Sequence, residues 1–189
     1  MKTYTIPSLV LKEQFPEHNK LKTEILKLIS EDGVAERSQE TISKTDWDYK
    51  TNWERPWFKL IREPLTQSLG KFVQHMGYKS FIAHDIWYQQ YVVGDSHTWH
   101  IHGGNYTGVY YLELDETAPT TEILYPDNPN KCFTVEVKEG DLIFFPCHLI
   151  HRSAISSSKQ RKSIISWNCS FQFIQDQLLK DKENIERLK

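Results

Sequence analysis

Cysteine, long apolar runs and an excess of charge of one sign are all scarce in this sequence of 189 residues. Its three cysteines, Cys132, Cys147 and Cys169, form no C-x-x-C pair, which favours a reduced, cytoplasmic protein, although one disulfide stays open. No apolar run approaches the roughly 20 residues that span a bilayer. Residues 1–7 lack the long apolar stretch of a signal peptide. We therefore expect neither secretion nor membrane insertion.

Charge is also close to balanced, with 23 basic and 25 acidic residues and a formal net charge of −2. A strongly basic chain would suggest nucleic acid or a membrane surface as partner, and this chain gives no such indication. Aromatic residues make up 13% of the sequence, which argues for a packed core and against a disordered chain. The length suits a single domain over 1–189.

The first part of the chain, 1–80, is predicted to be a mainly helical support region. A short strand is expected at 4–10, closed by 12–16, and 35–44 reads as loop. An amphipathic helix should begin at an Asn19 cap and end near Gly33, and a second should run from Pro56 to Gly77, with a kink at Pro64. The aromatic residues between them either pack the helices onto a sheet or line a substrate entrance: Trp47, Tyr49, Trp53 and Trp57.

From Phe81 the hydrophobic period changes from helical to strand-like. Strands are predicted at 81–93, 98–102, 107–114, 121–125, 132–138, 142–146, 149–155 and 162–173, separated mostly by turn residues. The predicted fold class is therefore mainly β with helices (α+β). It is a jelly roll (double-stranded β-helix) over 81–173, with the N-terminal helices on one sheet and a C-terminal helix over 174–189.

The most informative residues are His100, His102 and His151. Side chains two apart on a strand leave from the same face, so His100 and His102 should point the same way. With a third ligand from a distant strand they could bind a divalent transition metal and leave coordination positions open. An H-x-H pair alone is a weak signal, and the alternative is a pair of ordinary surface histidines.

Four features in fixed order strengthen the pattern, and they come from residues 91–94, 100–102, 140–151 and 161–168. They are Tyr91-Val92-Val93-Gly94, His100-Ile101-His102, the run from Gly140-Asp141 through Pro146 to His151, and Arg161 through Asn168. Together with Thr107 through Leu112, this set resembles the 2-oxoglutarate/Fe(II)-dependent oxygenases, in particular a small prolyl-hydroxylase-like group that carries H-x-H in place of H-x-D. The resemblance covers about residues 81–173.

The resemblance implies an enzyme that binds Fe(II) and 2-oxoglutarate and uses O₂ to hydroxylate a substrate, with release of succinate and CO₂. His100 and His151 would be iron ligands, and His102 would stand where the common acidic ligand stands; alternatively water or Asp115 fills that place. Arg161 would pair with the far carboxylate of 2-oxoglutarate, and Ser163, on the same strand face, would add a hydroxyl. Lys162 would then face outward. Tyr91 would contact the cosubstrate.

Several assignments stay open at this stage. Tyr110 and Tyr111 should point to opposite faces, so one of them lines the cavity, and Tyr111 is our candidate. His97 and His148 are expected to be loop or structural histidines, and Asn168 is an uncertain pocket residue. The substrate, a small molecule or a peptide, cannot be identified, and a homodimer is compatible with exposed sheet edges.

Two other functions fit the same residues. The first is a cupin-type three-histidine metalloprotein, a dioxygenase or isomerase that does not use 2-oxoglutarate. Gly94 before the H-x-H and Gly140 before Pro146 resemble cupin motifs, but the expected glutamate after the H-x-H is missing. The second is a non-catalytic jelly-roll binding module whose histidines are structural. Burial of the three histidines together in a cavity would argue against that module.

Overall fold

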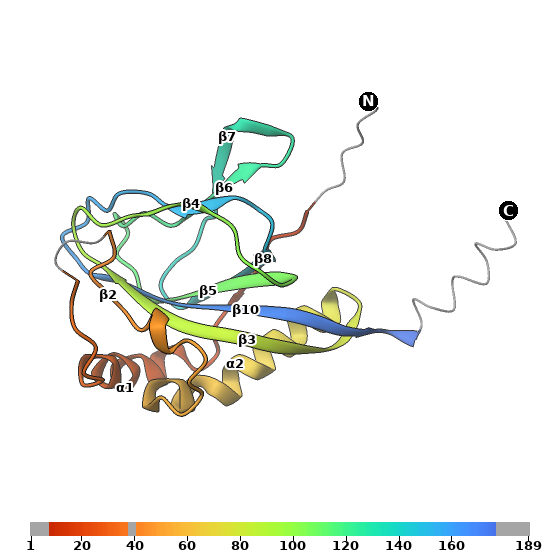
Figure 1. The fold of residues 1–189 in the computed structure, drawn as a ribbon, viewed down its shortest axis with the longest axis horizontal. Coiled ribbons are helices and arrows are strands. Elements are labelled where there is room, and N and C mark those ends of the chain that lie inside the picture. The colour runs from red at the N-terminus through yellow and green to blue at the C-terminus, as the bar shows by residue number, and fades with distance from the viewer. Residues whose placement is uncertain (1–7, 38–40, 177–189) are drawn as a thin grey trace, which may run out of the picture.

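The computed structural model describes residues 8–37 and 41–176. Two α-helices, α1 (His18–Ser30) and α2 (Pro56–His75), lie side by side under one face of a β-sheet (Figure 1). Pro56 begins α2 because a proline at the first helical position costs no hydrogen bond. A 3₁₀ turn at Trp47–Tyr49 connects the helices to the sheet. Between residues 8 and 176, no helix is both long enough and apolar enough to cross a membrane.

The strands form two sheets. The larger sheet has the order β1-β8-β5-β10-β3-β2 and the smaller one the order β4-β9-β6-β7. Their bounds are β1 (Leu11–Gln14), β2 (Lys44–Thr45), β3 (Tyr78–Tyr91), β4 (His97–His100), β5 (Tyr106–Glu113), β6 (Thr121–Tyr125), β7 (Asn128–Thr134), β8 (Asp141–Pro146), β9 (His151–Ser153) and β10 (Lys162–Ile174). The long antiparallel pair β3–β10 runs through the middle of the molecule (Figure 1).

Both faces of the larger sheet are buried, each against a different layer. One face packs on the helices, where Ile25, Ile61 and Leu69 meet Ile165 and Trp167. The opposite face packs on the smaller sheet, in a second core whose buried members are Tyr91, Val109, Tyr111, Ile123, Val135, Ile143, Phe145, Leu149 and Ile164. The molecule therefore has three layers, and the second core lies between the two sheets.

The predicted fold class is confirmed, because the chain forms two antiparallel sheets with helices on one of them. Most strand bounds agree to within three residues. Three local predictions were wrong. The first strand was expected at 4–10, closed by 12–16, but β1 is Leu11–Gln14 and pairs with β8 at the edge of the sheet. β7 was expected to begin at 132 but begins at Asn128, because the turn between β6 and β7 is shorter than its prolines suggested. Helix α1 begins at His18 without a side-chain cap from Asn19. The predicted C-terminal helix lies almost wholly outside the described residues.

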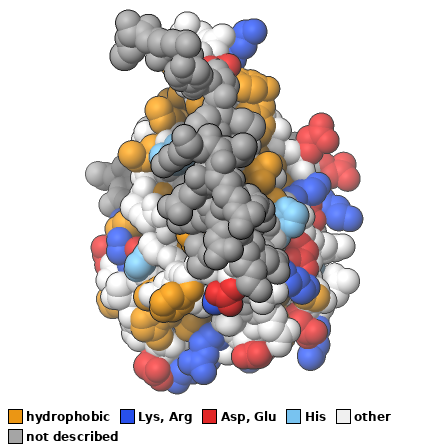
Figure 2. Space-filling model, turned by 90° about the vertical axis from the view of Figure 1, so that its right-hand side faces the viewer, with side chains coloured by type: hydrophobic (Ala, Val, Ile, Leu, Met, Phe, Trp, Pro, Cys, Tyr) orange, Lys and Arg blue, Asp and Glu red, His pale blue; other side chains and the backbone are white. Residues whose placement is uncertain are grey.

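On the face shown in Figure 2, acidic and basic side chains are interspersed and no large patch of one sign is visible. This distribution agrees with the net charge of −2. It gives no electrostatic reason to expect nucleic acid at that face.

Gly108 of β5 is required by the packing of the sheet. A Cβ added there would lie 2.1 Å from Cζ2 of Trp167 and 2.8 Å from the carbonyl oxygen of Ile143. We expect Gly108→Ala to lower the free energy of unfolding by about 2 kcal/mol or more, because buried Trp167 must shift. Urea unfolding measures this. The control is Gly70→Ala in α2, where a new Cβ meets nothing within 4 Å and should stabilise the helix by about 0.5 kcal/mol. Equal midpoints for Gly108→Ala and the wild type would contradict the prediction.

Candidate metal centre and cosubstrate cavity

A tight connection places β4 over the larger sheet. Gly94, with φ +91°, turns the chain after β3, and this conformation suits glycine. The buried carboxylate of Asp95 accepts hydrogen bonds from the backbone N–H groups of Val92 and Ser43 and from the Ser43 hydroxyl. These bonds fix the start of β4, which carries His100 to the mouth of the cavity between the sheets.

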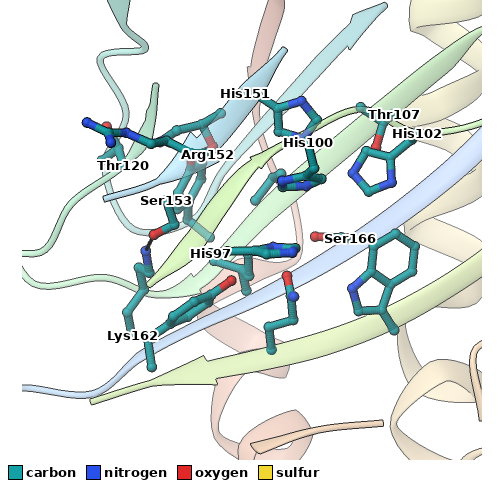
Figure 3. A pocket seen from close by; sticks show the side chains of 17 residues that line it. His97, His100, His102, Thr107, Thr120, His151, Arg152, Ser153, Lys162 and Ser166 are labelled. Carbon is teal, nitrogen blue, oxygen red and sulfur yellow. Dashed lines mark hydrogen bonds between the residues drawn. The ribbon is translucent and has the colours of Figure 1, made fainter. Parts of the chain in front are cut away.

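Strand pairing then brings the distant histidine into place. His100 and His151 are register partners in the β4–β9 ladder, although 51 positions separate them in the sequence. His102 follows β4, and its backbone N–H donates to the carbonyl of Cys147. The candidate ligand atoms of His100, His102 and His151 all lie within 4.8 Å of one another (Figure 3). The structure thus brings all three sequence-predicted ligands to one point.

The protonation of these imidazoles suits a metal. Nδ1 of His100 lies 2.7 Å from the carbonyl oxygen of Thr98, and Nδ1 of His151 lies 2.8 Å from that of Leu149. Because a carbonyl only accepts, both Nδ1 atoms carry the proton and both Nε2 atoms keep a lone pair, as in metal-bound histidines. Burial lowers the pKa of His102 to about 3 and that of His151 to about 4, with their histidine neighbours adding to the effect. All three are therefore neutral at pH 7, which is the form that binds a divalent metal.

The histidines line a cavity between the two sheets, together with aromatic, hydroxyl and cationic side chains. No aspartate or glutamate is among the described residues that line it. Its lining is Trp87, Gln89, Tyr91, His97, His100, His102, Thr107, Val109, Tyr111, Thr120, Thr121, His151, Arg152, Ser153, Lys162, Ile164 and Ser166. With neutral imidazoles, a bound divalent ion would bring its full charge to this cavity, and an anionic ligand would balance that charge.

Lys162 supplies the cation inside the cavity, and its side chain is 2% exposed. Its ammonium donates to the hydroxyl of Ser153 (2.5 Å) and to the carbonyl of Pro119 (2.8 Å), and it lies 4.3 Å from the ring centre of Tyr91. None of the carboxylates in the described ranges, 8–37 and 41–176, pairs with it. Burial therefore lowers the pKa of Lys162 to about 7. A buried ammonium without a carboxylate partner is costly and points to an anionic ligand.

The predicted directions of Arg161 and Ser163 are reversed in the structure. Arg161 lies outside the cavity and is paired with Glu113 through its Nε at 2.9 Å. The Ser163 hydroxyl is buried on the other face of β10, where it donates to Glu113 and accepts from the Gln90 amide. Lys162, expected to point outward, faces the cavity. The physical reason is that both faces of β10 are buried, so hydrophobicity does not tell which face meets the second sheet.

The tyrosine assignments are resolved by the same two layers. Tyr91 and Tyr111 are both fully buried and line the cavity, and the Tyr111 hydroxyl lies 2.6 Å from that of Thr121. Tyr110 points to the helical layer, where its hydroxyl bonds to Nδ1 of His18. Tyr111 is therefore the cavity residue of the pair. Burial raises the pKa of Tyr111 to about 12, so its phenol stays protonated.

Four other sequence candidates have clear positions. His97 lines the cavity, with its ring stacked on His100 at 3.9 Å between ring centres, so it is more than a loop histidine. His148 is exposed, and Asp115 bonds to Thr117 and Ser158 away from the cavity, so neither lies beside the three histidines. Asn168 donates to Asp85 and lines a neighbouring surface pocket next to His102.

The aromatic residues of the 47–57 segment differ in their surroundings. Trp57 is buried in the helical core, as the packing role predicts. Trp47 is 38% exposed, packs edge-on against Trp87 at 4.5 Å, and lines the same surface pocket as Asn168. Trp47 therefore lies at the surface, beside the cavity residue Trp87.

Sequence reasoning missed Lys162, Gln89 and Ser166 as cavity residues. A signal for one of them was present, because strand alternation from Tyr91 places Gln89, like Trp87, on the same face. In the β3–β10 register, Tyr91 is opposite Lys162 and Trp87 is opposite Ser166. That register is a tertiary fact, so Lys162 and Ser166 could not be assigned from the sequence.

Comparison with solved structures shows what this architecture is similar to. A viral collagen prolyl hydroxylase from Paramecium bursaria Chlorella virus-1, solved with 2-oxoglutarate, superposes with a TM-score of 0.64 at 14% identity, over 85% of this chain and 94% of that one. A 2OG-Fe(II) oxygenase family oxidoreductase from Burkholderia pseudomallei gives 0.65 at 10% identity, over 88% and 86%. A Trichoplax adhaerens prolyl hydroxylase, bound to a hypoxia-inducible-factor peptide, gives 0.58 at 15%, over 89% and 84%.

These neighbours belong to the 2OG-Fe(II) oxygenases, and this chain has their fold. No family model matches the sequence, and no curated protein matches it either. The likeness is therefore one of architecture.

Proposed function

We propose that this protein is an Fe(II)- and 2-oxoglutarate-dependent dioxygenase that hydroxylates a peptide or a small molecule. The observation that carries the proposal is the pairing of two features in one cavity. Three neutral imidazoles converge within 4.8 Å, and a buried ammonium that has no carboxylate partner among the described residues lines the same cavity. A metal that binds a 2-oxo acid and a cation that binds its far carboxylate are the two requirements of this cosubstrate.

His100, His102 and His151 would hold the iron. Imidazole suits Fe(II), and three protein ligands leave positions for a bidentate 2-oxo acid and for O₂. Bound Fe(II), 2-oxoglutarate and O₂ supply the oxidation, and the protein supplies orientation and a dry cavity. With three neutral imidazole ligands, the charge of +2 on Fe(II) would be balanced by the charge of −2 on 2-oxoglutarate. In a site with a carboxylate ligand, the same complex would carry one negative charge.

Lys162, in place of Arg161, would bind the far carboxylate. Its ammonium is bonded to Ser153, two residues beyond His151 on β9 and hence roughly 7 Å along the strand. The terminal carbons of an extended five-carbon chain lie about 5 Å apart. A dicarboxylate of that length can therefore reach from the metal to the ammonium. Tyr91 and Tyr111 would form the wall around its methylene groups.

The test is anaerobic titration of the Fe(II)-loaded protein with 2-oxoglutarate, followed by visible absorbance. We expect a weak metal-to-ligand charge-transfer band that saturates at one equivalent, because a 2-oxo acid chelates through its carboxylate and oxo oxygens. Glutarate, which has the same length but no oxo group, is the control and should give no band. Stoichiometric iron without a band would favour the cupin-type three-histidine site instead. Failure to bind any divalent metal would mean that the histidines are structural.

A further inference from the structure

A strip of three polar side chains lies on the larger sheet below the histidines: Trp87 and Gln89 of β3, and Ser166 of β10. We call them the polar strip. Trp87 and Ser166 are direct register partners, and Gln89 is opposite Ile164, two residues along. All three line the cavity, and Figure 3 shows Ser166 below the rings of His100 and His102.

The polar strip is buried, but its side chains have no hydrogen-bond partners among the residues that the structure describes. Trp87 is 1% exposed, and Gln89 and Ser166 are each 5% exposed. Nε1 of Trp87 has no hydrogen-bond partner among the described residues. The Gln89 amide and the Ser166 hydroxyl also have no partner among those residues. Buried polar groups in native proteins are almost always paired, because an unpaired one costs stability. Three on one cavity wall therefore call for a reason.

The surroundings show that this is not a general property of the sheet. On the opposite face of the same two strands, Gln90 donates to Ser163 at 3.0 Å, and Ser163 donates to Glu113. Within the cavity, Thr107 donates to the carbonyl of Trp167, and Tyr111 bonds to Thr121. Elsewhere among the described residues, fully buried side-chain atoms without a partner belong to Ser68, Ser156, Trp167 and Asn168, and none of these four lines the cavity.

The polar strip lies at the metal end of the cavity. Along β10, Lys162 and Ser166 are four residues apart, about 13 Å between their Cα atoms, and Ile164 lies between them on the same face. Trp87 packs beside His102, with 5.7 Å between ring centres. The cavity thus has a cation at one end and Trp87 and Ser166 at the other, next to the histidines, with Gln89 between the two ends.

We propose that the polar strip recognises the end of the cosubstrate nearest the metal, the first carboxylate and the adjacent oxo group. The proposal rests on the function proposed above. The indole N–H, the serine hydroxyl and the glutamine amide together offer three kinds of donor, and this end of a 2-oxo acid presents three acceptor oxygens. Hydrogen bonds to an anionic oxygen are stronger than neutral ones. The polar strip would therefore select a 2-oxo acid, while Lys162 would select its second carboxylate.

The experiment compares two ligands by anaerobic calorimetry on the Fe(II)-loaded protein. 2-Oxoglutarate carries both ends, whereas pyruvate carries only the 2-oxo acid end. We expect Ser166→Ala and Gln89→Met each to weaken both ligands about tenfold, so that the ratio of the two affinities does not change. Lys162→Met should instead bring that ratio close to one, because only 2-oxoglutarate carries the second carboxylate that Lys162 would bind. Trp87→Phe, which removes the indole N–H together with its five-membered ring but keeps an aromatic side chain, should likewise weaken both ligands.

Matched controls come from the opposite face of the same strands. Ser163→Ala and Gln90→Met remove side chains that are bonded to each other, so they should lower the melting temperature and leave both affinities unchanged. Ser166→Ala and Gln89→Met should show the reverse, with unchanged or higher melting temperature and weaker binding. A merely structural role for the polar strip would not produce this reversal.

The two proposals fail in different ways. If the wild type binds 2-oxoglutarate and the polar strip variants bind both ligands as tightly as it does, the polar strip inference is overturned and the dioxygenase proposal stands. If the wild type binds iron but neither 2-oxo acid, the proposed function itself is overturned, and the polar strip inference with it.

Discussion

Replacing His151 with alanine should abolish stoichiometric iron binding. His151 reaches the metal position from β9, while His100 and His102 come from the segment around β4, so its loss leaves only the H-x-H pair. Loss of a residue that merely orients a metal ligand costs about 10- to 100-fold in affinity, so loss of a ligand should cost at least about 100-fold. Anaerobic Fe(II) titration, with metal content measured after gel filtration, gives the affinity.

The control for that variant is His148→Ala, three residues earlier in the same connection. His148 is exposed and lies outside the cavity lining. It should leave iron affinity and circular dichroism unchanged. Should His151→Ala retain full iron occupancy with a wild-type melting temperature, His151 would not be a ligand, and the three-histidine site would be wrong.

Replacing Lys162 with methionine should weaken 2-oxoglutarate by about 100-fold, with iron binding retained. Methionine keeps the length and the contact with Tyr91 but removes the charge. The carboxylate would then lie in a buried cavity without a partner, and losing one member of such a pair costs about 2–5 kcal/mol. Titration of the Fe(II) protein with 2-oxoglutarate measures the loss.

Arg161→Ala is the matched control, one residue earlier in the chain. Its guanidinium is 43% exposed and pairs with Glu113 outside the cavity. Its removal should leave the affinity for 2-oxoglutarate within about twofold of the wild-type value, because exposed ion pairs contribute little energy. If Arg161→Ala loses 2-oxoglutarate and Lys162→Met does not, the side chains exchange roles and the sequence-based assignment is the correct one.

The Lys162 prediction has a pH dependence. Burial lowers the pKa of Lys162 from 10.5 to about 7, so the free cavity holds an ammonium below pH 7 and a neutral amine above it. The far carboxylate needs the ammonium, so binding above pH 7 requires proton uptake. The affinity for 2-oxoglutarate should then fall by up to about tenfold for each pH unit above 7. In Lys162→Met this decline should be absent, and an equal decline in both proteins would assign it to another group.

The sequence predicted the order of the elements well, because the hydrophobic period itself changes at Phe81. Leu21, Ile25, Leu28 and Ile29 follow the helical repeat, and after residue 81 alternation and turn residues indicate strands. Edge elements were the weak point. β1 and β2 are short and polar, and they exist only because β8 and β3 offer them unpaired backbone groups. Such pairing leaves no local pattern in the sequence.

By itself, the sequence placed His100 and His102 two residues apart, although β4 ends at His100 and His102 is held by its backbone hydrogen bond to Cys147 and not by strand alternation. It also determined the ordered spacing of the motifs through His151. Only the tertiary structure decided that β4 and β9 pair in the register that places His100 opposite His151. It alone also decided that Lys162 and Ser166, rather than Arg161 and Ser163, face the cavity. The reason is that β10 is buried on both sides, between helices and a second sheet, and polar and apolar residues occur on both of its faces, so the layers around it decide which face meets the cavity.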